Sequence, residues 1–289
     1  MVSHSYGLRI AIVSTTNRPG TVTHHPVIMT FSAFDPSGLT GITADALTLS
    51  AFGCHPVAVP TVQLSADSER QHDAVPADAE LINDQARTVL EDMPVSAFVI
   101  GMLADAETVS VLAEIVSDYA NVPLVLAPAW SGHQEDSEDD LVSACADLLI
   151  PQSDILVVSS LLASRFGDGD EGEGDSDNMA DAATLGRALS ALGAEHTLLT
   201  GAQAPTRQII NHLYHKEALL RRDSWPRRAG VVRGANELLA ASIAACLAQG
   251  MPMTDAVGHA QQYLQQALDH AYRPGMGSLM PGRPPVNQG

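Results

Sequence analysis

Apolar and polar positions follow one another along the chain in blocks that predict strands and helices in turn. The apolar run 27–31 predicts a buried strand, and a turn-rich loop follows it at 35–38. Apolar residues then recur at helical spacing over 43–52, and Gly53 stands where a left-handed residue ends many helices. Strand, loop and helix in this order place a helix N-terminus beside a small ligand, although many α/β domains have such a turn without one.

The alternation continues to the end of the chain. It predicts strands at 57–59, 98–103, 123–126, 155–158 and 196–200, a polar loop at 65–76, and a hairpin at 207–214 and 217–221. Helices are predicted at 77–93, 105–119, 141–149, 179–192, 235–247 and 254–270, with Asp105 and Thr254 as caps. Continuous apolar strands between helices are typical of a mostly parallel sheet covered on both faces, so we predict a three-layer α/β/α sandwich.

We expect a single domain over residues 27–280. Residues 1–26 are interpreted as an N-terminal extension in which Leu8 to Val13 forms a short strand, and 281–289 as a tail. The acidic run 167–178 lacks the calcium-loop pattern and is interpreted as a solvated insert. The adjacent histidines at 24 and 25 lack a third ligand at suitable spacing, so no metal site is predicted.

Composition narrows the class of protein. Of the 289 residues 45% are hydrophobic, which is ample for a large core, yet no apolar run is long enough for a transmembrane helix. The N-terminus does not resemble a signal peptide, and three widely spaced cysteines fit a reducing compartment. A cytoplasmic location is therefore expected.

Charge bears on possible partners. The formal net charge of −19 argues against nucleic acid and anionic membranes, which require a basic surface. Acidity of this kind is typical of a surface that favours solubility. Lys216 is the only lysine, which matters for any enzyme that handles phosphate groups.

The segment Ser32-Ala33-Phe34-Asp35-Pro36-Ser37-Gly38-Leu39-Thr40-Gly41-Ile42-Thr43-Ala44-Asp45 resembles a family block. It is similar to the opening G-[ST]-D-P-S-G-G-A-G-I-Q-A-D of the hydroxymethylpyrimidine/phosphomethylpyrimidine kinases of thiamine biosynthesis, a branch of the ribokinase-like superfamily. The resemblance implies a ribokinase-like fold, a homodimer, and phosphoryl transfer from Mg-ATP to a pyrimidine. It extends to about Leu279, where Gly275 and Gly277 echo a closing glycine pattern.

The resemblance also implies a pyrimidine site. The family's substrate aspartate falls on Asp45, and the methionine that packs on the ring falls on Met102. Gly41 belongs to the same loop. The next substrate contact, a glutamine, falls on Ala66, and Gln63 is its nearest substitute. An Asp that accepts from an amino group and a Met on an apolar face suit a small aminopyrimidine.

On the catalytic side this chain departs from the family pattern. The positions of a metal-site Asp, an Asn, a Glu and a phosphate Lys hold Ala127, Ser159, Leu162 and Thr200. The anion hole falls on Gly234, Ala235 and Asn236, and Glu237 replaces the family's cysteine. Since phosphoryl transfer depends on positioning and charge stabilisation, these losses predict weak or no activity.

Three functions remain open. The chain binds an aminopyrimidine with weak or no phosphotransfer, or it is an active ATP-dependent kinase with Glu237 as base. The third is a structural or regulatory protein that acts through partner contacts.

Overall fold

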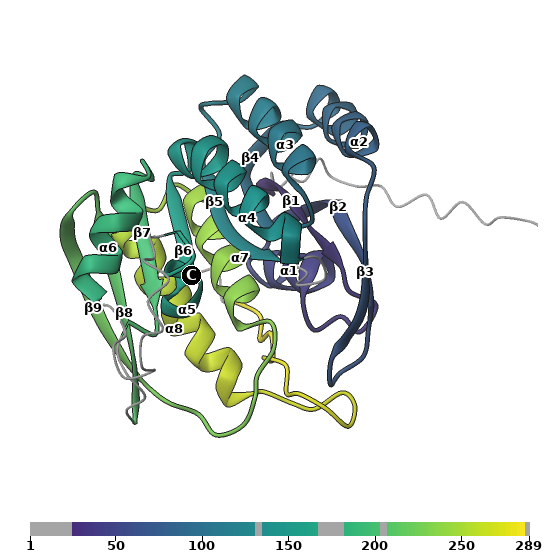
Figure 1. The fold of residues 1–289 in the computed structure, drawn as a ribbon. Helices are drawn as coiled ribbons and strands as arrows, with labels where there is room; N and C mark the ends of the chain where they lie inside the picture. Colours follow the sequence, from purple (N-terminus) through teal and green to yellow (C-terminus); the bar gives the residue numbers. More distant parts are fainter. Residues whose placement is uncertain (1–24, 131–134, 167–181, 203–206, 287–289) are drawn as a thin grey trace, which may run out of the picture.

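The structure, a computed structural model, describes residues 25–130, 135–166, 182–202 and 207–286. Within these ranges the strands form one nine-stranded sheet in the order β3-β2-β1-β4-β5-β6-β7-β8-β9 (Figure 1). Pairing is parallel from β2 to β7, whereas β3, β8 and β9 pair antiparallel at the two edges. The predicted mostly parallel sheet is confirmed.

The elements follow one another with short connections. The strands are β1 (Val27–Phe34), β2 (His55–Ala66), β3 (Gln71–Pro76), β4 (Val95–Leu103), β5 (Leu124–Trp130), β6 (Ile155–Ser159), β7 (His196–Thr200), β8 (Gln208–His215) and β9 (Ala218–Pro226). The helices are α1 (Gly41–Ala51), α2 (Ala79–Asp92), α3 (Ala106–Asp118), α4 (Glu135–Ala144), α5 (Ser160–Ala163), α6 (Ala182–Ala191), α7 (Ala235–Ala248) and α8 (Met253–Asp269).

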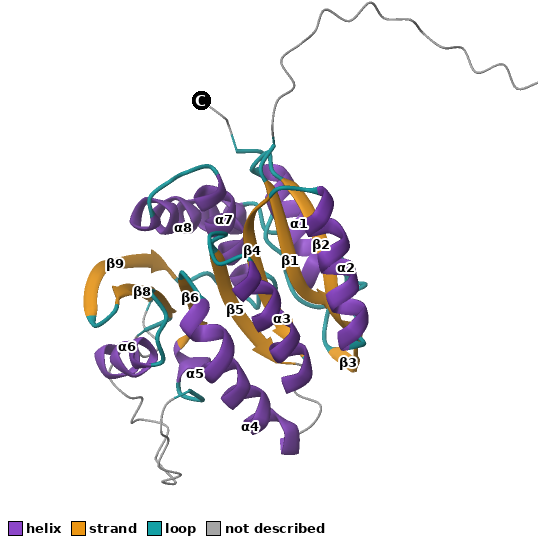
Figure 2. Ribbon diagram, turned by 90° about the horizontal axis from the view of Figure 1, so that it is seen from above, coloured by secondary structure: helices purple, strands orange, loops and turns teal. Residues whose placement is uncertain are grey.

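Two hydrophobic cores lie on opposite faces of the sheet. Along β1, Met29 and Phe31 pack into one core while Ile28 packs into the other, as the two-residue period of a strand requires. The first core includes residues of α2, α3, α4 and α6, and the second includes residues of α1, α7 and α8. Figure 2 shows these two helical layers with the sheet between them, which completes the predicted sandwich.

Two local predictions are confirmed. Asp105 caps α3 by accepting a hydrogen bond from the Thr108 backbone N–H at 2.8 Å. Gly53 has a φ of 72°, as expected for a residue that ends α1. The predicted hairpin is also present as β8 and β9.

Two others are wrong. The segment predicted as a polar loop at 65–76 contains β3, whose residues are all at least partly exposed and therefore show no apolar alternation. This strand forms through antiparallel backbone pairing with residues 62–66 of β2. Thr254 does not cap the last helix, because α8 already begins at Met253 and Pro252 occupies the cap position.

The C-terminal residues 281–286, expected as a tail, pack against two helices. The Gly282 N–H donates to the Ala267 carbonyl of α8 at 2.9 Å, and the Val286 N–H donates to the Ala51 carbonyl at the end of α1 at 3.0 Å. Their partial burial shows that this segment belongs to the folded part of the chain.

Some predictions fall outside the described residues. These are the strand at Leu8 to Val13, the histidine at position 24 and the acidic insert 167–178. The neighbouring His25 is described, and its Nδ1 lies 2.6 Å from the Gly53 carbonyl oxygen. Among the helices of the described ranges, none combines the length and the apolar character needed to span a bilayer.

Candidate functional site

Asp35 shapes the loop that follows β1. Its carboxylate is 1% exposed. It accepts four hydrogen bonds, from the backbone N–H and hydroxyl of Ser37 (2.8 and 2.6 Å) and of Thr40 (3.2 and 2.6 Å). Both oxygens are therefore used to turn the chain toward α1. An Asp before Pro-Ser-Gly is a known turn signal, and it is the sequence feature from which this structural role could have been predicted.

Gly41 and Met102 lie at the carboxyl ends of neighbouring strands, where α/β proteins bind ligands. Gly41 has a φ of 65°, and a Cβ there would lie 2.0 Å from the Ala33 carbonyl oxygen. Met102 is half-buried and packs on the small cluster of Ala33, Val62 and Leu64. Its N–H donates to the Ser32 hydroxyl at 3.1 Å, which ties β4 to β1.

Gln63 does not share a face with Met102. Its neighbours Val62 and Leu64 on β2 are buried in the cluster that contacts Met102. Since side chains alternate along a strand, Gln63 projects from the opposite face, and it is exposed. The structure therefore brings Met102 and the loop around Gly41 to one end of the sheet, but it does not place Gln63 and Met102 on one wall.

Asp45 is a buried carboxyl on α1, only 1% exposed. Its Oδ1 has no hydrogen-bond partner among the described residues. Burial raises the pKa of Asp45 well above its usual range, and the neighbouring Glu237 raises it further, while Arg283 lowers it. A buried acceptor without a donor is costly, so this oxygen is suited to a donor group.

The residues predicted to form an anion hole lie at the N-terminus of α7. Gly234 precedes the helix with a φ of 82°, and a Cβ there would lie 2.1 Å from the Leu39 carbonyl oxygen. This close approach holds the start of α7 against the loop that follows β1. The backbone N–H groups of Ala235 and Asn236 belong to the first turn, where a helix favours negative charge.

Glu237 brings its own negative charge to this helix end. The pKa of Glu237 is raised, chiefly by burial and also by Asp35, while its own backbone N–H, Arg233 and Arg283 lower it. The Glu237 carboxylate would thus occupy the position that the helix N-terminus otherwise offers to a bound anion.

Four positions that the family resemblance assigns to Mg-ATP carry neither a carboxylate nor an amine. Ala127 lies in the middle of β5. The Ser159 hydroxyl accepts from the Leu162 N–H at 3.2 Å and so caps α5, while Thr200 ends β7. Among the described residues no group of three His, Cys, Asp or Glu side chains could hold a metal ion. These four positions therefore supply no carboxylate ligand for a magnesium ion and no ammonium group for a phosphate.

A cavity of about 400 Å³ lies beside the start of α7. It is bounded by Ala235 and Asn236 of α7, by Asn211 and Trp225 of the hairpin, and by Gln265 of α8. Ala235 and Asn236 belong both to the wall of this cavity and to the predicted anion hole. Its volume suits a small organic ligand.

Gln261 on α8 fixes two walls of this cavity. Its side chain is fully buried, and its Oε1 accepts from Asn211 Nδ2 at 2.8 Å and from Trp225 Nε1 at 2.9 Å. Its Nε2 donates to Asp223 at 2.8 Å, and Asp223 pairs with Arg221 at 2.6 Å. Sequence periodicity gives no sign of this network, because its members lie on three elements.

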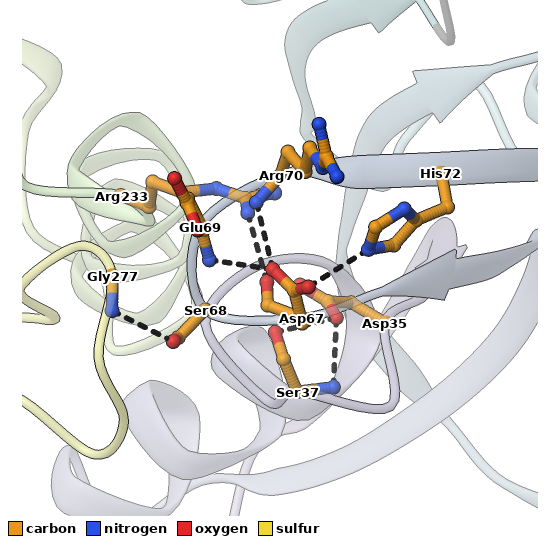
Figure 3. A network of polar contacts seen from close by, with 9 residues as sticks. All are labelled: Asp35, Ser37, Asp67, Ser68, Glu69, Arg70, His72, Arg233 and Gly277. Atoms are coloured by element: carbon orange, nitrogen blue, oxygen red, sulfur yellow. Dashed lines mark hydrogen bonds and ion pairs between the residues drawn. The ribbon is translucent and has the colours of Figure 1, made fainter.

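The turn between β2 and β3 closes over the C-terminal glycines (Figure 3). Ser68 accepts a hydrogen bond from the Gly277 N–H at 3.0 Å, and Arg233 donates to the Asp67 carbonyl at 3.2 Å. A Cβ on Gly275 or Gly277 would lie within 2.5 Å of Ser68 atoms. The glycine pattern noted in the sequence therefore permits this close contact.

This chain is similar to known vitamin-precursor kinases in both sequence and fold. A hydroxymethylpyrimidine/phosphomethylpyrimidine kinase of Rhizobium meliloti is 28% identical over 90% of this chain and 96% of its own length. The pyridoxal kinase of Bacillus subtilis, solved as an ADP complex, superposes with a TM-score of 0.79 at 20% identity and covers 90% of this chain and 98% of its own. The phosphomethylpyrimidine kinase of Clostridium difficile superposes with a TM-score of 0.68 at 22% identity, over 83% and 100% of the two chains.

The structural likenesses show that the fold is that of the pyridoxal and phosphomethylpyrimidine kinases, a ribokinase-like sandwich. The sequence model of the phosphomethylpyrimidine kinase family matches residues 35–281, which is most of the chain. The match begins at the Asp35 loop and ends at the segment that follows the closing glycines. The chain therefore belongs to the phosphomethylpyrimidine kinase family.

Proposed function

We propose that this member of the family binds a small aminopyrimidine and has weak or no phosphotransferase activity. Its place among the hydroxymethylpyrimidine/phosphomethylpyrimidine kinase-like proteins of thiamine biosynthesis follows from the family match. Beyond that match, we propose the binding of a pyrimidine and the loss of phosphotransferase activity. The observation that carries it is the contrast between the two ends of the site.

The pyrimidine end keeps its shape. Gly41 and Met102 lie at adjacent strand ends, and Asp45 has a buried acceptor without a donor. An exocyclic amino group is a donor that would satisfy this oxygen, and a half-buried methionine offers an apolar, polarisable surface to a ring. Gln63 is exposed on the other face of β2, so we do not include it in the proposed pocket.

The phosphate end has lost its charge balance. Glu237 stands at the helix N-terminus, and Ala127, Ser159, Leu162 and Thr200 supply no metal ligand or ammonium. Each group that stabilises transferring charge is typically worth 10² to 10³ in rate, or roughly 3–4 kcal/mol. Several absent groups together favour a rate too low for an ordinary kinase, although such effects are not additive.

Ligand-induced stabilisation tests the pyrimidine assignment. Hydroxymethylpyrimidine is expected to raise Tm, by mass action, more than Mg-ATP does at the same concentration. The variant Asp45→Asn keeps an acceptor oxygen but lacks the charge, and Asp45→Ala lacks both. We expect Asp45→Ala to abolish the shift. A shift that persists in Asp45→Ala would exclude this residue as a ligand.

An active kinase is the second candidate. The raised pKa of Glu237 and the cavity beside Ala235 and Asn236 favour it, because a carboxyl that accepts a proton more readily would lie next to a space for a ligand. Mg-ATP would then be the phosphoryl donor. This candidate requires transfer that depends on the Glu237 carboxylate.

We also propose a homodimer, on the strength of the family resemblance alone. Sedimentation equilibrium at micromolar concentration tests it, and a monomer mass would refute it.

A further inference from the structure

The segment Pro281–Val286, which we call the C-terminal strap, delivers one side chain to the candidate site. Backbone bonds to Ala267 and Ala51 anchor it at two points. The Tyr263 hydroxyl adds a third contact, donating to the Pro284 carbonyl at 3.0 Å. The strap is thus fixed to α8 and α1, and the position of Arg283 within it is determined.

Arg283 is half-buried between these helices. Its Nε donates to the Thr48 hydroxyl of α1 at 3.0 Å, and its Nη1 donates to the Pro281 carbonyl at 3.2 Å. Its Nη2 is buried and has no hydrogen-bond partner among the described residues. A guanidinium with an unsatisfied N–H group is costly to bury unless negative charge lies nearby.

Two carboxyls provide that charge. Asp45 lies three residues before Thr48, so both project from one side of α1 toward Arg283. Glu237 lies in the first turn of α7, which packs on α1. Electrostatic interactions connect Arg283 with both carboxyls and with Tyr263 and Tyr272. Asp35 and Arg233 are the further charged groups that act on Glu237.

We propose that Arg283 is the internal counter-cation of Asp45 and Glu237, and thereby a positioning residue that holds the Glu237 carboxylate at the N-terminus of α7. The strap supplies, from the far end of the chain, positive charge at a site that has no lysine. The cluster is independent of the proposed function, because it stands whether or not a pyrimidine binds.

The cluster has a definite pH dependence. Burial raises the pKa of both carboxyls in the folded state, and Arg283 opposes this rise. Removing the guanidinium raises both pKa values further above those of the unfolded chain. The resulting loss of stability is small where the carboxyls are protonated, and it grows as the pH rises through their folded-state pKa values. Arg233 limits the effect at Glu237, whereas Asp35 enlarges it.

Arg283→Met tests the proposal, since methionine keeps much of the apolar stem but not the charge. We expect Tm to fall by on the order of 10 °C at pH 8 and by less at pH 5, where a larger fraction of the carboxyls is protonated. Arg283→Lys should recover part of the loss. Arg87→Met, which breaks an exposed pair with Asp118 on the other side of the sheet, should change Tm by about 2 °C or less at either pH.

A double variant keeps the proposal testable if Arg283→Met folds poorly. Arg283→Met combined with Glu237→Gln removes the cation and one anion together, so it should melt higher at pH 8 than Arg283→Met alone. The carbon-13 titration of the Glu237 carboxyl should shift to higher pH in the single variant. Equal Tm losses at pH 5 and pH 8, additive double-variant effects or an unchanged titration would overturn the proposal. Pyrimidine binding by the wild-type protein reports on the proposed function separately.

Discussion

The functional assignment of the candidate site depends most on Glu237. This residue lies in the first turn of α7, and a helix N-terminus attracts anions. A phosphate group would have to compete with this resident charge. The same carboxyl, with its raised pKa, is the only group at the anion hole among the described residues that would serve as the base of the second candidate.

Gly41 is the residue at which the loop after β1 is most sensitive to change. Gly41 and Gly250 both have positive φ values, 65° and 82°, but a Cβ would meet the Ala33 carbonyl at 2.0 Å in the first case and nothing within 4 Å in the second. Gly250→Ala should therefore cost about 1 kcal/mol from backbone conformation alone. Gly41→Ala should cost roughly 3 kcal/mol or more, because backbone must also move.

Urea unfolding of the two variants measures this difference. Equal losses of unfolding free energy would mean that the loop after β1 relaxes freely, and that Gly41 does not hold it against β1.

Helix α8 contributes to the cavity through Gln261. Gln261→Leu leaves the Asn211 amide, the Trp225 indole and Asp223 each without one hydrogen bond, and should lower the unfolding free energy by roughly 2–4 kcal/mol. It should also shift the Trp225 emission, measured in a Trp130→Phe background, since the indole loses its acceptor.

Gln265→Leu is the matched control one turn further along α8. The Gln265 Oε1 is buried without a partner among the described residues, so its removal should be nearly neutral. Similar losses in the two variants, or an unchanged Trp225 emission in Gln261→Leu, would contradict the positioning role of Gln261.

At the level of elements, prediction from sequence succeeded where burial leaves a pattern. The buried strands, the caps at Asp105 and Gly53 and the hairpin all follow from spacing. The strand β3 did not, because its stability comes from backbone pairing and its side chains are exposed or partly exposed. The cavity walls and the strap were also missed, since contacts such as Arg283 with Thr48 join residues far apart in the chain.

At the scale of the whole molecule, the sheet brings the two ends of the family match together. The Asp35 loop from the start of the matched region packs on Gly234 near its end, and the strap returns to α1. Figure 1 shows α7 and α8 beside α1 on one side of the sheet. The fold thus matches that of the related kinases, while several positions that the resemblance assigns to the phosphate end hold other residues.

The net charge of −19 also disfavours the binding of phosphate groups. The negative field of an acidic protein repels a polyphosphate, and this repulsion is stronger at low ionic strength. The weak phosphate binding that we propose therefore agrees with the overall charge as well as with the local departures at Ala127 and Thr200.

Single-turnover phosphoryl transfer tests the central claim most directly. The protein would be in excess over hydroxymethylpyrimidine with Mg-ATP present, and the product would be read by mass spectrometry. The account predicts retained pyrimidine binding and little or no phosphorylated product. Rapid formation of product that disappears in Glu237→Gln would contradict it, and would identify this chain as a kinase with Glu237 as its base.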